Sequence, residues 1–458
     1  MIALRILGVL AVLCIAAVVG LFTLAWQSSI APVSRPAASD FDPAKIKRGA
    51  ALAALGDCNT CHTTTGGGAF AGGVPVPTPF GTIYSTNITP DEDTGIGRWS
   101  EAAFRRALRQ GVDRAGHQLY PAFPYDHFTL LSDDDISALY AFVMTRKPVR
   151  AVAPASGLPF PLNIRMIVAG WKLLFFHQGP FKPNPNQSDE LNRGAYLVDG
   201  IGHCGACHTP RNALGAENMG NAFGGGEVDG WTAYALNKDS PAPVPWDGKA
   251  LHDYLRRGWS SEHGMAHGPM VQVIENLKSI SDSDIAAMTS YLSNVFGEPS
   301  AERRRAAEAL LVREYGSHGA AQAGSTPTGA QNVGAMIYQS TCAICHEGGQ
   351  PLPFGGIDLA LSTGPSGPNA RNVINVVLWG FPAASGERAP IMPGFADALT
   401  DSQLEELLTY IRSRFSDKPA WTDLAHDIRV ARGNRPDVSS APGTDPAGRA
   451  VSEHEARR

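Results

Sequence analysis

The globular part of this 458-residue chain has no cysteine left for a structural disulfide. Six of its seven cysteines lie in three short motifs, and the seventh, Cys14, lies in an apolar N-terminal stretch. A disulfide framework of the kind that stabilises small secreted domains is therefore excluded. The paired cysteines must serve another chemistry.

The chain also lacks an excess of charge of either sign. Its 38 Lys and Arg residues nearly balance its 43 Asp and Glu residues, and the formal net charge is −5. Nucleic-acid partners are excluded, because they require a strongly basic face. The sequence has almost no strand-like alternation, no glycine-rich nucleotide loop, no nucleophile elbow and no metal-hydrolase signature. We therefore expect no substrate chemistry in this chain itself.

One long hydrophobic run is present, over residues 6–26. These 21 residues carry no charge, and Arg5 precedes them. Their length and composition predict a transmembrane helix that anchors the chain, with its N-terminus on the cytoplasmic side. A cleaved signal peptide is the alternative, although its apolar core is usually about 7–15 residues long. Either alternative exports the rest of the chain.

The six cysteines fall into a repeated Cys-x-x-Cys-His motif. The motifs begin at residues 58, 204 and 342 and read CNTCH, CGACH and CAICH. After each motif, a Ser or Thr followed by acidic residues begins an apolar-periodic run, which is typical of a capped helix. These runs cover residues 132–144, 281–294 and 400–413.

The repeats predict a mainly α protein made of three tandem domains of one kind, with long irregular loops rich in its 49 Gly and 34 Pro residues. Residues 164–176, in the first linker, could form an interfacial helix that contacts a membrane or partner, or a connector packed on its own domains. The predicted segments are an anchor or signal at 1–30, domain 1 at 42–147, a linker at 148–188, domain 2 at 189–297, a linker at 298–332, domain 3 at 333–416 and a polar, disordered tail at 417–458.

In an exported protein, Cys-x-x-Cys-His is typical of covalent haem c attachment. Two thiols three positions apart reach the two vinyl groups of one porphyrin, and the adjacent histidine binds the iron. A thioredoxin-like pair needs a βαβ setting, and structural zinc needs four ligands; neither is present. The sequence thus predicts three haem c groups, one in each domain. The three domains resemble cytochrome c. The predicted thioether residues are Cys58, Cys61, Cys204, Cys207, Cys342 and Cys345, and the predicted proximal ligands are His62, His208 and His346.

Methionines in the loops before the closing helices are candidates for the sixth iron ligand. Met270 follows His208 by 62 residues, and Met392 follows His346 by 46 residues. Prolines beside both methionines stiffen the loops that present the sulfur. Met265 is a competing candidate in domain 2.

Domain 1 has no methionine at the equivalent position. Phe123 stands there, 61 residues after His62, and a phenyl ring cannot bind iron. His127 is the natural substitute and would give bis-histidine ligation with a lower potential. His117, Met144 and an open or water-bound site are the alternatives.

Four stretches together resemble the three-haem cytochrome c subunits of bacterial membrane-bound dehydrogenases for alcohol, aldehyde, gluconate, sorbitol or fructose. They are STNITPDEDTGIGRWS (85–100), LYPAFPY (119–125), RGAYLVDGIGHCGACHTPRNALG (193–215) and HGPM (267–270), and the resemblance covers most of residues 45–415. It implies an electron relay from a periplasmic dehydrogenase subunit through three haems to ubiquinone. It also implies a place on the periplasmic side of the inner membrane.

The resemblance further implies a catalytic partner of the molybdenum and iron–sulfur, PQQ or flavin type, with or without a small iron–sulfur subunit. PAFPY together with HGMAHGPM is closer to cytochromes that pair with molybdenum enzymes for aldehydes or N-heterocycles. Phe123 departs from the commoner YPAMPY, which puts methionine ligation of the first haem in doubt. A stand-alone electron shuttle, or a haem peroxidase with an open site at the first haem, are the alternative functions.

Overall fold

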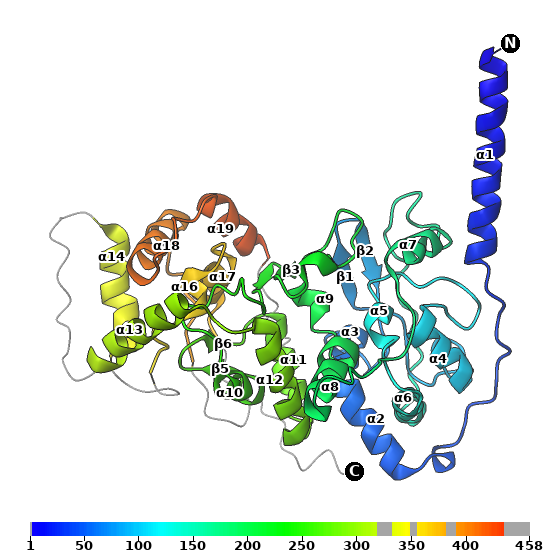
Figure 1. Cartoon of the computed structure of the whole chain (residues 1–458), viewed down its shortest axis with the longest axis horizontal. Helices are drawn as coiled ribbons and strands as arrows, with labels where there is room; N and C mark the ends of the chain where they lie inside the picture. The colour runs from blue at the N-terminus through cyan, green and yellow to red at the C-terminus, as the bar shows by residue number, and fades with distance from the viewer. Residues whose placement is uncertain (1, 318–331, 349–354, 382–390, 435–458) are drawn as a thin grey trace. The chain divides into compact units, whose positions relative to one another are not determined.

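The computed structural model describes residues 2–317, 332–348, 355–381 and 391–434, and within them it is mainly helical (Figure 1). These residues form two compact units. The first unit comprises residues 2–206, 211–217 and 276–291, and the second comprises residues 207–210, 218–275 and the described residues within 292–434.

The first unit contains all the elements of domain 1, together with the N-terminal helix, the first linker and the start of domain 2. Its elements are α1 (Ile2–Ala25), η1 (Ala38–Asp40), α2 (Pro43–Leu55), α3 (Cys58–His62), β1 (Pro75–Thr78), β2 (Gly81–Tyr84), α4 (Glu101–Gln110), α5 (Tyr125–Phe128), α6 (Asp133–Met144), α7 (Ile167–Phe175), α8 (Asp189–Ala195) and η2 (Tyr196–Ile201).

The second unit contains the rest of domain 2 and domain 3. Its elements are η3 (Met219–Asn221), β3 (Gly226–Val228), β4 (Trp231–Ala233), α10 (Gly248–Arg257), β5 (Trp259–Ser260), β6 (Gly264–Met265), α13 (Ala301–Ser317), α14 (Val333–Ile337), η4 (Tyr338–Cys342), α15 (Ala343–His346), α16 (Thr363–Ser366), α17 (Arg371–Trp379), α18 (Asp401–Phe415) and α19 (Leu424–Gly433). Three further helices have residues in both units: α9 (Gly205–His208), α11 (Pro269–Leu277) and α12 (Asp282–Phe296).

The closing helices predicted for the three domains are confirmed as α6, α12 and α18. Ser132 caps α6, since its hydroxyl accepts a hydrogen bond from the backbone N–H of Asp135 at 3.2 Å. Thr400 caps α18 in the same way, and Gln403 returns a bond to the backbone N–H of Thr400. The polar residues that begin each run thus set where each helix starts.

Each opening helix crosses the closing helix of its domain at a glycine. A Cβ atom on Gly49 of α2, Gly194 of α8 or Gly334 of α14 would collide with a backbone carbonyl of α6, α12 or α18, respectively. These carbonyls belong to Ala138, Ala287 and Glu406. Only glycine allows the two backbones to come this close, so the same helix pair is built three times along the chain.

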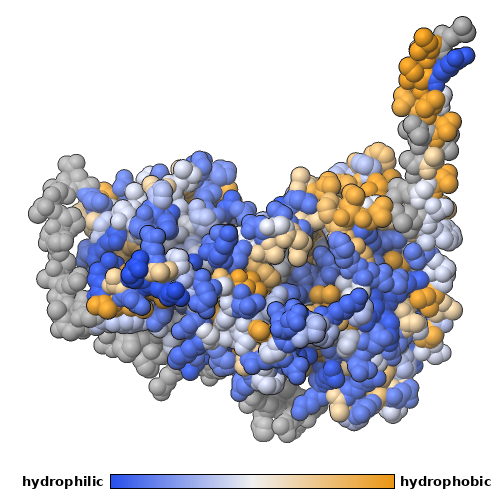
Figure 2. Space-filling view, in the orientation of Figure 1, coloured by the Kyte–Doolittle hydropathy of each residue, from blue (hydrophilic) through white to orange (hydrophobic). Residues whose placement is uncertain are grey.

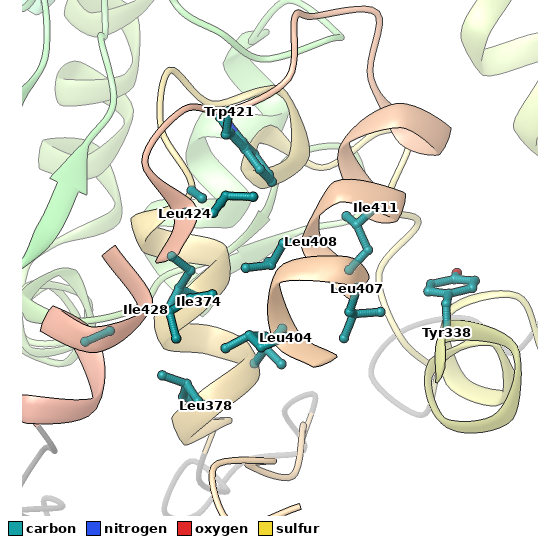
Figure 3. Packing of buried hydrophobic residues seen from close by; sticks show 13 residues of the cluster. Tyr338, Ile374, Leu378, Leu404, Leu407, Leu408, Ile411, Trp421, Leu424 and Ile428 are labelled. Atoms are coloured by element: carbon teal, nitrogen blue, oxygen red, sulfur yellow. The ribbon is translucent and has the colours of Figure 1, made fainter. Parts of the chain in front are cut away.

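Domain 3 has an apolar core between α17, α18 and α19 (Figure 3). Side chains from the three helices meet there; those labelled in Figure 3 on these helices are Ile374, Leu378, Leu404, Leu407, Leu408, Ile411, Leu424 and Ile428. The helix α19 lies in the region where a polar tail was expected from residue 417. The structure differs there because Leu424, Ile428 and Ala431 recur at helical spacing and pack against this core. Residues 435–458 lie outside the described residues.

The described strands are short and form three separate two-stranded antiparallel sheets, β1–β2, β3–β4 and β5–β6. The hairpin β3–β4 turns at Asp229 and Gly230, which have φ angles of 48° and 77°. Two positive φ angles are the mark of a tight hairpin turn that Asp-Gly favours. Strands of two to four residues are too short to show an alternating pattern in the sequence.

The predicted transmembrane helix is wrong. The apolar run does form a helix, α1, but no helix among the described residues is long and apolar enough to cross a membrane. The prediction rested on a run of uncharged residues, and such a run favours a helix whether or not that helix meets the requirement of spanning a bilayer.

The helix α7 confirms that the run at 164–176 contains a helix, and it has an exposed apolar face. Leu173 and Leu174 are 71% and 65% exposed, and Phe160 in the preceding loop is 79% exposed. Figure 2 shows hydrophobic side chains gathered over this part of the surface. Whether this face contacts a membrane or a partner stays a prediction.

Candidate haem sites

Each Cys-x-x-Cys-His motif ends in one short helix. These helices are α3, α9 and α15, and each ends at the histidine of its motif. Residues three apart lie on the same side of a helical turn, so the two cysteines of a motif can face one planar group.

The three motif histidines share one hydrogen-bonding arrangement. In each, Nδ1–H donates to a backbone carbonyl: His62 to Thr86 at 2.6 Å, His208 to Tyr234 at 2.7 Å and His346 to Ile357 at 2.8 Å. A carbonyl only accepts, which fixes the tautomer and makes Nε2 the nitrogen with the lone pair. Metal-binding histidines are oriented in this way.

A glycine loop lies directly behind each motif. A Cβ on Gly72 would collide with the backbone of Thr86, and a Cβ on Gly226 would collide with the backbone of Cys207. A Cβ on Gly356 would lie 2.9 Å from Nδ1 of His346. The loops are also tied to the motifs by backbone bonds; for example, the N–H of Gly72 donates to the carbonyl of His62 at 2.8 Å. These glycines let the loop reach the histidine that it orients, so they serve the motif and not a phosphate.

Burial keeps these sites neutral. It lowers the pKa of His62, His208 and His346, because it disfavours the charged imidazolium. Burial, followed by the charges of Cys61 and Asp57, raises the pKa of Cys58 to about 12. A redox thiol needs a lowered pKa, so this motif does not resemble a thioredoxin-like pair. A neutral imidazole beside the cysteines fits a histidine that binds haem iron through Nε2.

Met270 lies in the first turn of α11 and is half-buried. Just before it, a Cβ on Gly268 would lie 2.6 Å from the indole of Trp231. The competitor Met265 lies in β6, where its carbonyl accepts a hydrogen bond from Nδ1 of His267 at 2.8 Å. Both assignments of the sulfur ligand stay predictions.

Met392 is held by the end of α17. Its carbonyl accepts a hydrogen bond from the N–H of Phe381 at 2.8 Å, and its side chain packs against the core of domain 3. A Cβ on Gly380 would collide with that same carbonyl. Met392 thus has a defined place in the fold, and its role as an iron ligand stays a prediction.

The loop that contains Phe123 is packed by aromatic rings. The ring of Phe123 contacts the rings of Tyr125 and Phe128, at 6.4 and 5.4 Å between centroids. His117 forms a pair with Asp113, with 3.0 Å between Nδ1 and the carboxylate. Met144 is fully buried in α6.

Both ring nitrogens of His127 have partners. Nδ1–H donates to the carbonyl of Asp199 at 2.6 Å, and Nε2 pairs with a carboxylate oxygen of Glu217 at 2.8 Å. The side chains of His127 and Glu217 are 12% and 8% exposed. The prediction that His127 binds the first haem stays open, and it requires Glu217 to release Nε2.

The His127–Glu217 pair is a buried ion pair. Burial alone would lower the pKa of His127, but the hydrogen bond and charge of Glu217, together with the charge of Asp126, raise it to about 9. Burial alone would raise the pKa of Glu217, but His127 outweighs it and the pKa is lowered. Asp199 and Glu217 lie 72 and 90 residues from His127. No local pattern in the sequence announces partners at that separation.

The helix pairs and the motif histidines define this protein as a c-type cytochrome. Residues 46–147 match the family described as cytochrome c, and residues 329–411 match that described as cytochrome c oxidase, cbb3-type, subunit III. Haem c is therefore its cofactor.

Similar proteins indicate which kind of c-type cytochrome this is. The gluconate 2-dehydrogenase cytochrome c subunit of Pantoea cypripedii is 37% identical over 85% of this chain and 90% of its own length. The fructose dehydrogenase cytochrome subunit of Gluconobacter japonicus is 35% identical over 85% of this chain and 83% of its own length. The chain belongs to the family of cytochrome c subunits of dehydrogenases, and it relays electrons in such a complex.

A third relative is longer. A nicotinate dehydrogenase subunit of Pseudomonas putida is 44% identical over 90% of this chain, but the chain spans only 34% of that protein. The matched part corresponds to nearly all of this chain.

Proposed function

We propose that this chain holds three haem c groups and passes electrons from a dehydrogenase subunit to ubiquinone on the periplasmic side of the inner membrane. The supporting observation is the threefold repetition of one arrangement, a Cys-x-x-Cys-His turn whose histidine donates Nδ1–H to a loop carbonyl. A single motif could arise by chance, whereas three with the same orienting bond could not.

The roles of the residues follow from their chemistry. The six motif cysteines hold the porphyrins through thioethers, and the three motif histidines bind iron through Nε2. Met270, Met392 and His127 are the proposed sixth ligands. Haem c, when bound, supplies reversible one-electron chemistry at iron, and the protein sets each potential through the axial ligand, burial and nearby charge.

We propose that the partner is a molybdenum-containing subunit that oxidises an aromatic N-heterocycle. Two observations support this: the 44% identity to the nicotinate dehydrogenase subunit, and the PAFPY and HGMAHGPM motifs. A small iron–sulfur subunit would link the two. Such a dehydrogenase removes two electrons from each substrate molecule, and one-electron carriers in series accept them singly.

The first experiment counts haem. The full chain is produced with the machinery for haem c attachment, and the intact mass and the pyridine haemochrome absorbance are measured. We expect three covalent haems per chain, and two in each variant that replaces one pair of motif cysteines by alanine. The matched control is Cys14→Ala, which keeps three. Fewer than three haems in the unmodified chain, or purification without any dehydrogenase subunit, would contradict the proposal.

A further inference from the structure

The hairpin β3–β4 of domain 2 is bonded to helix α17 of domain 3 by asparagine side chains. Asn372 makes two bonds to the backbone of Thr232: its Oδ1 accepts from the N–H at 2.8 Å, and its Nδ2 donates to the carbonyl at 2.9 Å. Asn375 Nδ2 donates to the carbonyl of Gly230 at 3.1 Å. Asn372 thus pairs with Thr232 as a neighbouring strand would.

The two asparagine side chains are buried and lie on one face of the helix. Asn372 and Asn375 are 2% and 8% exposed, and residues three apart lie on the same face of a helix. Removing either side chain would take away the hydrogen bonds that join the hairpin backbone at Thr232 or Gly230 to α17. The hairpin therefore has its position set by domain 3.

The hairpin also carries Trp231, whose indole packs against the loop that precedes Met270. A Cβ on Gly268 would lie 2.6 Å from the indole, and the ring of His267 lies 5.0 Å from that of Trp231. Gly268 has a φ of 56°, so the backbone there is set in a conformation that other residues rarely adopt. A shift of Trp231 would release this loop two residues before the proposed sulfur ligand.

The same helix α17 also leads into the loop of Met392. It ends at Trp379, and Phe381 then donates its N–H to the carbonyl of Met392 at 2.8 Å. The ring of Phe381 lies 6.4 Å from that of His267. One helix therefore supports the loops of both proposed sulfur ligands.

We propose that Asn372 and Asn375 of domain 3 are positioning residues for the second haem site: through β3–β4 and Trp231 they hold the Met270 loop, so that domain 3 completes a site whose ligands all belong to domain 2. This inference rests on the proposed role of Met270. A looser Met270 loop weakens the iron–sulfur bond and admits water, and both changes lower the potential of the second haem. The potential of that haem is thus coupled to the folding of domain 3.

The test uses the full-length protein with its haems attached. In the reduced state, each bound methionine gives a proton NMR methyl signal shifted far upfield by the porphyrin ring, and Met270→His and Met392→His assign the two signals. A potentiometric titration followed by absorbance then gives the midpoint of each haem. These variants first establish whether Met270 is a ligand at all.

In the double variant Asn372→Ala/Asn375→Ala, we expect the Met270 signal to broaden or vanish and the midpoint of the same haem to fall. The Met392 signal and the midpoint of its haem stay unchanged, because α17 keeps its own core contacts. Trp231→Phe keeps an aromatic ring on Gly268 and should give a smaller shift of the same sign. Asn375→Ala alone, which loses one bond, replaces the double variant if the latter does not mature.

The control is Glu227→Gln. It removes the ion pair between Glu227 and Arg371 at the edge of the same junction, 2.5 Å between charged atoms, but Glu227 is 61% exposed. Exposed pairs contribute little, so neither signal nor midpoint should move. An unchanged Met270 signal and midpoint in the asparagine variants would overturn the inference. If Met270→His removes no signal from the unmodified protein, the proposed ligand assignment fails instead.

Discussion

His127 illustrates how much the environment of one side chain decides. Its position after the PAFPY loop makes it a natural candidate for an iron ligand, yet its two nitrogens are bonded to Asp199 and Glu217. The side chains of His127 and Glu217 are both largely shielded from water. Removing the charge of one would therefore leave the charge of the other buried and uncompensated.

Glu217→Gln should therefore destabilise the protein by about 3 kcal/mol near pH 7. Because the pKa of His127 is raised from 6.5 to about 9, its contribution is complete below pH 6.5 and is lost as the pH rises through about 9. Because the pKa of Glu217 is lowered from 4.5, its contribution is lost as the pH falls below that value. Denaturant unfolding between pH 4 and pH 10 measures the difference between the two proteins.

The difference in unfolding free energy between the unmodified protein and Glu217→Gln should be largest near neutral pH. It should become smaller toward pH 4 and toward pH 10. The control is Glu92→Gln, which breaks an ion pair with Arg98 in which both side chains are 52% exposed. We expect a change within about 0.5 kcal/mol at every pH. A Glu217→Gln protein as stable as the control would show that the pair carries no net stabilisation.

Among the secondary-structure elements, the crossing of opening and closing helices is the feature that recurs in all three domains. Gly49, Gly194 and Gly334 each stand where a carbonyl of the partner helix would meet a Cβ. The motif turn follows the opening helix in each domain, so the crossing fixes where that turn begins. An identical packing problem is thus solved three times by the same residue type.

Gly334→Ala should destabilise domain 3 by about 1–3 kcal/mol, because the added methyl group must push α14 away from α18. Thermal unfolding followed by circular dichroism measures it as a lower midpoint. The matched control is Gly433→Ala in α19, where an added Cβ meets nothing within 4 Å. That variant should change stability by no more than about 0.5 kcal/mol. Equal midpoints for the two variants would be evidence against the close crossing.

For the molecule as a whole, function depends on how the potentials of several haems differ. The loops offer unlike surroundings. The loop before Met270 lies against Trp231, Met392 is bonded to the backbone of Phe381, and the loop of Phe123 contains no methionine. A thioether ligand raises the potential relative to an imidazole, so the first haem should have a lower potential than the other two if His127 binds it. Such a difference suits the entry of electrons.

Met392→His should lower the midpoint potential of one haem and leave the others in place, since it replaces sulfur by a better electron donor. A spectroscopic redox titration of the full protein measures this as one transition displaced to lower potential. Met219→His is the control, because Met219 is 71% exposed in η3. If both variants titrate like the unmodified protein, Met392 is not a ligand.

Local patterns in the sequence were sufficient to predict many of the helices and the candidate haem-binding residues. The three motifs, the capped closing helices and the helix at 167–175 all depend on residues close together in the chain, so their spacing alone predicts them. The N-terminal prediction failed because a run of uncharged residues indicates a helix without establishing a bilayer span. The helix α19 was missed because its few apolar residues gain their significance only from the core they meet.

Only the folded structure brings together groups that are far apart in the chain. The carboxylate of Glu217 at His127 and the asparagines 140 and 145 residues from the backbone groups they bind follow no repeat or period. Sequence spacing specifies which chemistry a residue can perform. Packing decides which partner a buried polar group must have, because a buried group without one costs free energy and the fold is selected to supply it.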